Sequence, residues 1–186
     1  THPVTVRVSR DGALMAETTE TVRTDASIVV AVADVDLWWP RGHGAQPLYD
    51  VTVTVGEHSW SQSLGFRTVN INSQPDAHGN PFEIQINGRL IHVRGANWIP
   101  DDAFVTRVDQ ARLERRIADA TEANMNLLRI WGGGMYESDE FYEICTREGV
   151  LVWQDFLLAC AAHSGEAWLA DEIIAEAREA VTRLLQ

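Results

Sequence analysis

The chain has 186 residues, of which 45% are hydrophobic and 23% are charged, an ordinary balance for a globular protein with a packed core. Its 27 acidic residues outnumber its 15 basic ones, and the formal net charge of -12 argues against nucleic acid as a partner. No apolar run approaches the roughly 20 residues that span a bilayer, which argues against a membrane as well.

Residues 1–72 have the pattern of β-structure. Valines alternate with polar residues at positions 4–8 and again at 51–55, and residues 28–32 form a short apolar run. Turn signals such as Asp11-Gly12 and the segment 40–44 separate these stretches. The pattern suits an antiparallel β-sandwich.

The segment 73–81 is polar and rich in turn-forming residues, which makes it the best linker candidate. Directly after it, two apolar stretches flank Asn87-Gly88, a dipeptide that strongly favours a β-hairpin. We therefore predict one domain at residues 1–72 and a second at residues 82–186, joined by this linker.

Strands and helices are predicted to alternate from residue 91 onward. Asp109 can cap the first helix, Ser138 the second and Ser164 the third. The apolar residues expected to face inward are Leu113, Ile117 and Ala120 in the first helix, Phe141, Ile144 and Cys145 in the second, and Ile173 or Ile174, Ala177, Val181 and Leu184 in the third. Such a β/α repeat is typical of a parallel sheet covered by helices.

Each predicted strand of the second domain leads into polar or aromatic side chains. The strands lie near residues 91–93, 127–130 and 150–154. The residues at or just beyond their carboxyl ends are Asn97, Trp98, Arg129, Trp131 and Asp155. In a barrel of parallel strands this end carries the active site, so we expect these side chains to meet at a common pocket. Gly132 to Gly134 would allow a sharp turn after the second strand.

The two cysteines, Cys145 and Cys160, are spaced neither as a zinc site nor as a disulfide framework. We expect two reduced thiols packed as small hydrophobes, and a cytoplasmic location is favoured. The six histidines are scattered, so no metal ligand is assigned among them.

Several separated motifs between residues 35 and 162 closely resemble the β-mannosidases of glycoside hydrolase family 2. These motifs are Leu37-Trp-Trp-Pro40, Gln46-Pro-Leu-Tyr49, Gly65-Phe-Arg67, Arg94-Gly-Ala-Asn-Trp-Ile-Pro-Asp-Asp-Ala-Phe104, Asn124-Met-Asn-Leu-Leu-Arg-Ile-Trp-Gly-Gly-Gly134 and Val150-Leu-Val-Trp-Gln-Asp-Phe156. The resemblance implies a multidomain α and β fold. Residues 1–72 would be an immunoglobulin-like β-sandwich that lacks its first strand or two, and residues 82–186 would hold the first three β/α units of a TIM (β/α)8 barrel.

A barrel of this kind needs eight units and roughly 250 residues, so we expect the chain to be a segment of a longer enzyme and the rest of the barrel to be its partner. The resemblance implies an exo-acting, retaining enzyme that needs no cofactor. It would remove terminal β-D-mannosyl residues from the non-reducing end of oligosaccharides or glycoconjugates.

Retaining glycosidases use two carboxyl groups about 5 to 5.5 Å apart. In this family the acid/base is a glutamate directly after an asparagine, and the nucleophile is a glutamate on a later strand. The chain contains no Asn-Glu dipeptide, so both are expected beyond Gln186, and the isolated chain is expected to be inactive.

The family resemblance also suggests roles for the five candidate residues. The Trp131 indole could form an apolar wall for a mannosyl ring, although most of the seven tryptophans must serve packing. Arg129 would orient the nucleophile and keep it ionised, or form a structural ion pair, and the two roles could coincide. Asp155 could bind substrate or support a neighbour, whereas Asn97 is favoured as a support for the site. Trp98 is the remaining substrate-binding candidate.

Asp101 and Asp102 look like a carboxylate pair, but adjacent residues in a turn more often cap or solvate the loop. Two alternatives to a β-mannosidase remain open: a β-galactosidase or β-glucuronidase of the same family, and a non-catalytic carbohydrate-binding or structural fragment.

Overall fold

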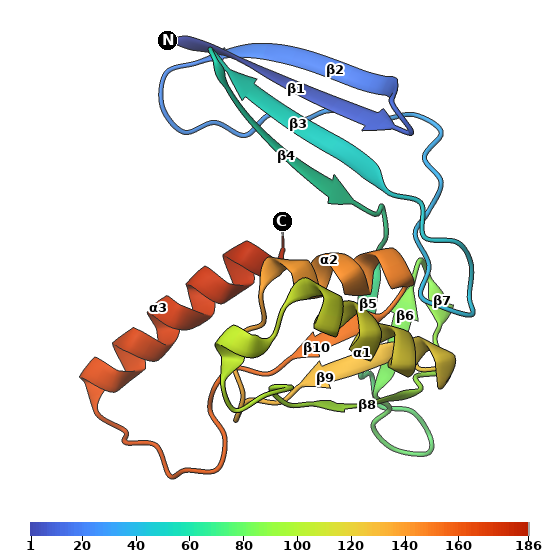
Figure 1. Cartoon of the computed structure of the whole chain (residues 1–186), viewed down its shortest axis with the longest axis vertical. Helices are drawn as coiled ribbons and strands as arrows, with labels where there is room; N and C mark the ends of the chain where they lie inside the picture. The colour runs from blue at the N-terminus through green and yellow to red at the C-terminus, as the bar shows by residue number, and fades with distance from the viewer. Residues whose placement is uncertain (186) are drawn as a thin grey trace. The chain divides into compact units, whose positions relative to one another are not determined.

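The computed structural model describes residues 1–185, which form mostly strands together with three α-helices (Figure 1). The predicted mixed α and β composition is confirmed. The chain divides into two compact units, residues 1–93 with 146–149, and residues 94–145 with 150–185. Each unit is described by itself below.

The first unit contains a four-stranded antiparallel sheet with the strand order β2-β1-β3-β4. Its strands are β1 (His2–Arg10), β2 (Ala13–Val22), β3 (Tyr49–Val55) and β4 (His58–Leu64). Asp11 and Gly12 have φ angles of 50° and 79°, which fits a tight turn between β1 and β2. The alternating valines at 4–8 and 51–55 therefore form strands, as predicted.

The apolar run at residues 28–32 is not a strand, so that prediction is wrong. It has no regular secondary structure, and the Val29 side chain is 84% exposed. The physical reason is that an apolar run becomes a strand only when a neighbour supplies backbone hydrogen bonds, and none of the described strands pairs with it.

A second, three-stranded antiparallel sheet in this unit has the order β5-β6-β7. Its strands are β5 (Val69–Asn72), β6 (Glu83–Ile86) and β7 (Arg89–Leu90). Asn87 and Gly88 have φ angles of 51° and 75° between β6 and β7, which confirms the predicted hairpin.

The segment 73–81 does not join the two compact units, contrary to its predicted role as a linker. It connects β5 to β6, which pair with each other from Val69 opposite Ile86 to Asn72 opposite Glu83. Backbone pairing therefore holds both ends of this segment in one sheet, and the division between the compact units falls after Val93.

The second unit is built on a parallel sheet with the order β10-β9-β8, and Figure 1 shows helices α1 and α2 beside it. The strands are β8 (Gly95–Trp98), β9 (Leu127–Ile130) and β10 (Leu151–Gln154). The helices are α1 (Gln110–Glu122), α2 (Asp139–Glu148) and α3 (Ala167–Leu184), with a short 3-10 helix at Val105–Arg107. The predicted alternation of strand and helix is confirmed.

The first strand of this sheet begins later than predicted. Ile91 is buried within the first unit, and β8 begins at Gly95. A Cβ atom at Gly95 would collide with the Leu127 carbonyl, so glycine allows the close approach of β8 to β9. As a consequence, Asn97 and Trp98 lie within the strand, where their side chains point to opposite faces.

The core of the second unit lies between the sheet and helices α1 and α2. Its buried residues are Leu113, Ile117, Ala120, Leu128, Ile130, Phe141, Ile144, Cys145 and Val150. The predicted inward faces of α1 and α2 are therefore confirmed. Asp109 caps α1, because its carboxylate accepts a 2.8 Å hydrogen bond from the Arg112 backbone N–H.

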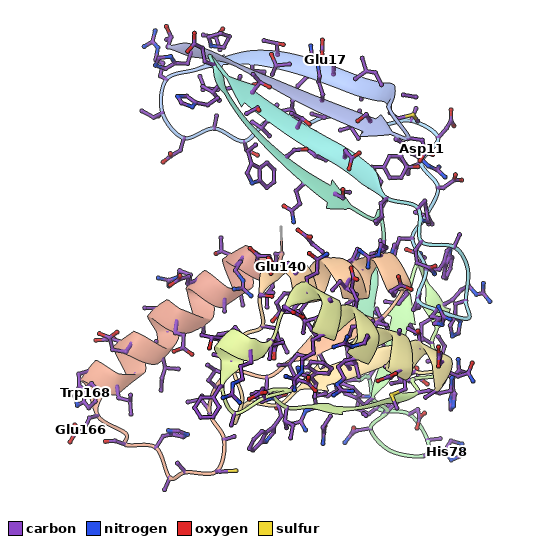
Figure 2. The ribbon with its side chains drawn as sticks, in the orientation of Figure 1. Asp11, Glu17, His78, Glu140, Glu166 and Trp168 are labelled. Atoms are coloured by element: carbon purple, nitrogen blue, oxygen red, sulfur yellow. The ribbon has the colours of Figure 1, made fainter. Side chains whose placement is uncertain are left out.

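Helix α3 begins at Ala167, not directly after Ser164 as predicted. Glu166 occupies the N-cap position, and the Ser164 hydroxyl instead accepts a 3.3 Å hydrogen bond from the Glu166 backbone N–H. Glu166 and Trp168 are labelled in Figure 2 at the start of α3, where the Trp168 indole N–H donates to the Glu166 carboxylate. The less exposed residues of α3 are Leu169, Ile173, Ala177, Ala180 and Leu184. Ile174 and Val181 are exposed, so the predicted inward position of Val181 is wrong.

Cys145 is buried, as predicted, and burial strongly raises the pKa of its thiol. Cys160 is exposed, so the prediction that it packs as a small hydrophobe is wrong. It lies outside regular secondary structure, in a segment that has no packed core around it to bury the thiol. Within residues 1–185 no helix is both long and apolar enough to cross a membrane, and no group of metal-binding side chains is found.

Candidate functional site

The candidate site lies on the face of the parallel sheet that the helices do not cover. Residues that pair across the three strands form rows. One row consists of Asn97, Arg129 and Trp153, and the next row consists of Trp98, Ile130 and Gln154. Trp98 and Ile130 pack into the core beneath the helices. Because side chains alternate along a strand, the row that contains Arg129 faces the opposite side.

Arg129 and Asp155 form a two-pronged ion pair. The Arg129 Nε donates to Asp155 Oδ1 at 3.1 Å, and one terminal nitrogen donates to Oδ2 at 2.6 Å. The Gly132 backbone N–H also donates to Oδ2, at 3.2 Å. The Asp155 side chain is 18% exposed and that of Arg129 is 39% exposed, so the pair is oriented yet accessible from solvent.

Asn97 of β8 is a second side-chain partner of Arg129, which thus links β9 both to β8 and to the end of β10. The second terminal nitrogen of Arg129 donates to Asn97 Oδ1 at 3.3 Å. The structure thus brings together Asn97, Arg129 and Asp155, three of the five residues selected from the sequence. Their functional roles stay predictions.

Trp153 belongs to the same row but was not selected from the sequence. It is 41% exposed, and the Arg129 guanidinium carbon lies 6.0 Å from its ring centroid, at the outer limit for a cation-π contact. Trp153 could have been selected from its position in the sequence, because it lies two residues before Asp155 and both side chains therefore lie on one face of an extended segment.

Trp131 lies immediately beyond β9 and extends its pairing with β8. Its backbone N–H donates to the Trp98 carbonyl at 3.0 Å. A Cβ atom at Gly133 would lie well under 3.0 Å from three carbons of the Trp131 indole. Gly133 therefore provides room for the indole, and none of Gly132 to Gly134 has the positive φ that a glycine-specific turn requires.

Trp98 does not lie with Asn97, Arg129 and Asp155, so its predicted position at the common pocket is wrong. Its indole N–H donates to Glu137 Oε1 at 2.9 Å, and its ring centroid is 5.0 Å from that of Phe141. The reason is the alternation of side chains along β8, which sends Trp98 to the helix side and Asn97 to the open side.

Glu137 is a buried carboxyl that the sequence analysis did not identify. It is 7% exposed, and desolvation raises its pKa, although the hydrogen bond from Trp98 acts in the opposite direction and Asp101 adds repulsion. Nothing in the local sequence marks it, because its burial depends on the packing of distant segments.

Asp101 and Asp102 are held by basic residues of α1. Arg112 binds both carboxylates, and Arg116 donates to Asp101 at 2.8 Å. Asp102 also accepts a 2.8 Å hydrogen bond from the Phe104 backbone N–H, which lowers its pKa together with the hydrogen bond from Arg112. Burial alone would raise the pKa of Asp101, but its two arginine partners outweigh burial and lower it. Both carboxylates therefore stabilise the loop after β8, as expected.

A small cavity of about 190 Å³ lies beside α3 in the second unit. Its walls include Tyr136, Phe156, His163, Ile173 and Glu176. It is thus lined by residues other than the Arg129 cluster, although Phe156 directly follows Asp155 in the chain.

Comparison with known proteins gives consistent matches. Residues 3–67 match the family described as glycosyl hydrolases family 2. A β-mannosidase of Capra hircus is 40% identical over 170 residues, which are 88% of this chain and 19% of that protein. The chain thus spans about a fifth of the length of the curated relatives it matches.

Solved structures show the same likeness. The crystal structure of a β-D-mannosidase from Dictyoglomus thermophilum matches with a TM-score of 0.89 and 33% identity, over 98% of this chain and 24% of that one. A β-glucuronidase of Faecalibacterium prausnitzii matches with a TM-score of 0.66 and 25% identity, over 82% of this chain and 23% of that one. The chain therefore belongs to glycoside hydrolase family 2, as a segment of the β-mannosidase type.

Proposed function

We propose that the full-length protein that carries this segment is an exo-acting, retaining glycoside hydrolase that removes terminal β-D-mannosyl residues from the non-reducing end of oligosaccharides or glycoconjugates. The structural observation that supports this proposal best is the accessible cluster of Asn97, Arg129 and Asp155 at the carboxyl ends of three parallel strands. Fixed donors and a carboxylate in this place suit the hydroxyl groups of a sugar.

The finer fold assignment is part of the same proposal. We assign the four-stranded sheet of the first unit to an immunoglobulin-like sandwich and the parallel sheet of the second unit to the first three β/α units of a TIM barrel. The regular order β10-β9-β8 supports this assignment, because successive strands of such a barrel are neighbours.

The side chains of the cluster have distinct proposed roles. Arg129, held on both prongs by Asp155, supplies fixed positive charge toward a catalytic carboxylate and keeps that carboxylate ionised. Asp155 and Asn97 fix the guanidinium, and Asp155 also accepts hydrogen bonds from substrate hydroxyls. Trp131 forms an apolar wall for the sugar ring.

The two catalytic carboxyl groups are assigned to another part of the protein. Asp101 and Asp102 are bound by arginines of α1, and Asp155 is held in an ion pair with Arg129. Glu137 is buried on the helix side of the sheet. The remainder of the barrel would then be an obligatory partner of this segment.

The proposal is tested by assaying the full-length protein with chromogenic β-mannoside, β-glucuronide and β-galactoside substrates. We expect hydrolysis of the mannoside to be preferred, with a β-configured first product. A preference for either of the other glycosides would overturn the assigned sugar. Residues 1–186 alone should show no turnover, and turnover by this segment would show that the catalytic carboxyl groups have been misplaced.

The second candidate function is carbohydrate binding without catalysis. The open face of the sheet fits this function equally well, because the oriented Arg129–Asp155 ion pair beside Trp153 can bind a sugar without any cleavage of its glycosidic bond. Binding of mannose oligosaccharides by the full-length protein with no hydrolysis would favour this function.

A further inference from the structure

We propose that Tyr142 and Gln154 are positioning residues that hold the Arg129–Asp155 pair from the helix side of the sheet. The inference rests on the proposed function for its kinetic test. It concerns side chains that do not reach the open face, and it assigns them a role in setting the geometry of that face.

Gln154 connects the two faces of the sheet. It is the last residue of β10, and Asp155 follows it directly. The Gln154 side-chain N–H donates to the Asp155 backbone carbonyl at 2.9 Å, while its Oε1 accepts a 2.7 Å hydrogen bond from the Tyr142 hydroxyl. One amide group therefore ties the backbone of Asp155 to helix α2.

Tyr142 is itself held from several directions. Its hydroxyl accepts a 3.3 Å hydrogen bond from the Glu137 backbone N–H. Its ring meets that of Phe141 edge to face at 5.4 Å between centroids, and the Arg183 guanidinium carbon lies 5.4 Å from its centroid. A side chain with so many neighbours has little rotational freedom, so its hydroxyl is a fixed anchor for Gln154.

Hydrogen bonds hold the Asp155 backbone on both sides of its Cα atom. Its N–H donates to the Ile130 carbonyl at 3.0 Å, and its carbonyl accepts the bond from Gln154. Two hydrogen bonds to Arg129 then depend on where that backbone places the carboxylate. Because hydrogen bonds weaken steeply with distance and angle, a shift of about 1 Å would break the two-pronged geometry.

The kinetic test is a double-mutant cycle in the full-length protein with a chromogenic β-mannoside. Tyr142→Phe should lower kcat/KM by about tenfold, because the anchor of Gln154 is lost while the ring remains. In an Asp155→Asn background the same substitution should change kcat/KM by less than about twofold. Equal effects in both backgrounds would overturn the inference, since a purely structural tyrosine would act independently of Asp155.

Two further variants make the test specific. Gln154→Glu keeps the acceptor for Tyr142 but removes the N–H donor to Asp155, so it should reproduce the loss even if Tyr142→Phe does not fold. Tyr49→Phe is the matched control, because Tyr49 is fully buried in the first unit and its hydroxyl accepts a 2.8 Å hydrogen bond from the Asp36 backbone N–H. Its kcat/KM should stay within about twofold of the wild type. Full activity of Gln154→Glu would overturn the inference.

A crystal structure of the Tyr142→Phe protein gives a readout that does not require activity. We expect at least one of the two Arg129–Asp155 hydrogen bonds to exceed 3.5 Å, and unchanged distances would overturn the inference. If the wild-type protein hydrolyses no β-mannoside, the proposed function fails, and these distances alone then decide whether the inference holds.

Discussion

Gly133→Ala tests whether the position of the Trp131 indole matters to activity. A Cβ atom at residue 133 would lie well under 3.0 Å from three carbons of that indole, closer than Cβ atoms pack in proteins. The ring must therefore move by about 1 Å or more to restore van der Waals contact. Gly133 does not have a positive φ, so the alanine introduces no backbone strain and its effect reports on the indole.

The expected result is a loss of catalytic efficiency with little loss of fold. Misplacement of a binding group by about 1 Å can cost up to about 100-fold in rate, so we expect kcat/KM for a chromogenic β-mannoside to fall by between about 10-fold and 100-fold. The assay is steady-state kinetics of the full-length protein, together with thermal unfolding to confirm that both proteins are folded.

Gly165→Ala is the matched control. A Cβ atom at residue 165 would meet nothing within 4 Å, so this alanine should leave the kinetics unchanged. If the two alanine variants have the same kcat/KM, the indole either tolerates the displacement or does not contact the substrate, and the assignment of Trp131 to the sugar wall would be refuted.

Three other substitutions test the surrounding interactions. Arg129→Lys should lower kcat/KM by about 100-fold, because lysine keeps the charge but cannot bind Asp155 with two parallel prongs; near-normal kinetics would show that charge alone suffices. Glu137→Gln should change stability in a pH-dependent way, because the folded-state pKa of Glu137 is raised above its ordinary value of 4.5. The wild type loses stability as the pH rises from the pKa of this carboxyl in the unfolded state through its pKa in the folded state. Because glutamine does not titrate, the variant should gain stability relative to the wild type over that range in thermal unfolding. A difference in stability that is constant with pH would contradict this. Asp109→Ala removes the N-cap of α1 and should lower the free energy of unfolding by about 1 kcal/mol, which urea titration would detect; no change would mean that solvent replaces the cap.

Features that depend on a few neighbouring residues were predictable from the sequence. The Asn87-Gly88 hairpin, the Asp109 cap and the buried faces of α1 and α2 are all confirmed. Each follows from backbone preferences or side-chain period within one element.

Predictions that needed to know which segments pair were less successful. The run at 28–32 has the composition of a strand but lacks a pairing partner among the described strands. The segment 73–81 has the composition of a linker but joins two strands of one sheet. Composition alone does not identify the strand that supplies the hydrogen bonds.

The sequence by itself determined that polar side chains gather at the carboxyl ends of three strands, because that grouping depends only on residue order and on the parallel direction of the strands. The tertiary structure decided which of these side chains share a face. A shift of the first strand to Gly95–Trp98 placed Asn97 beside Arg129 and sent Trp98 toward Glu137, since neighbouring residues of a strand point to opposite sides. The contact between Gln154 and Tyr142 likewise depends on how α2 packs against the sheet, which no local pattern of residues specifies.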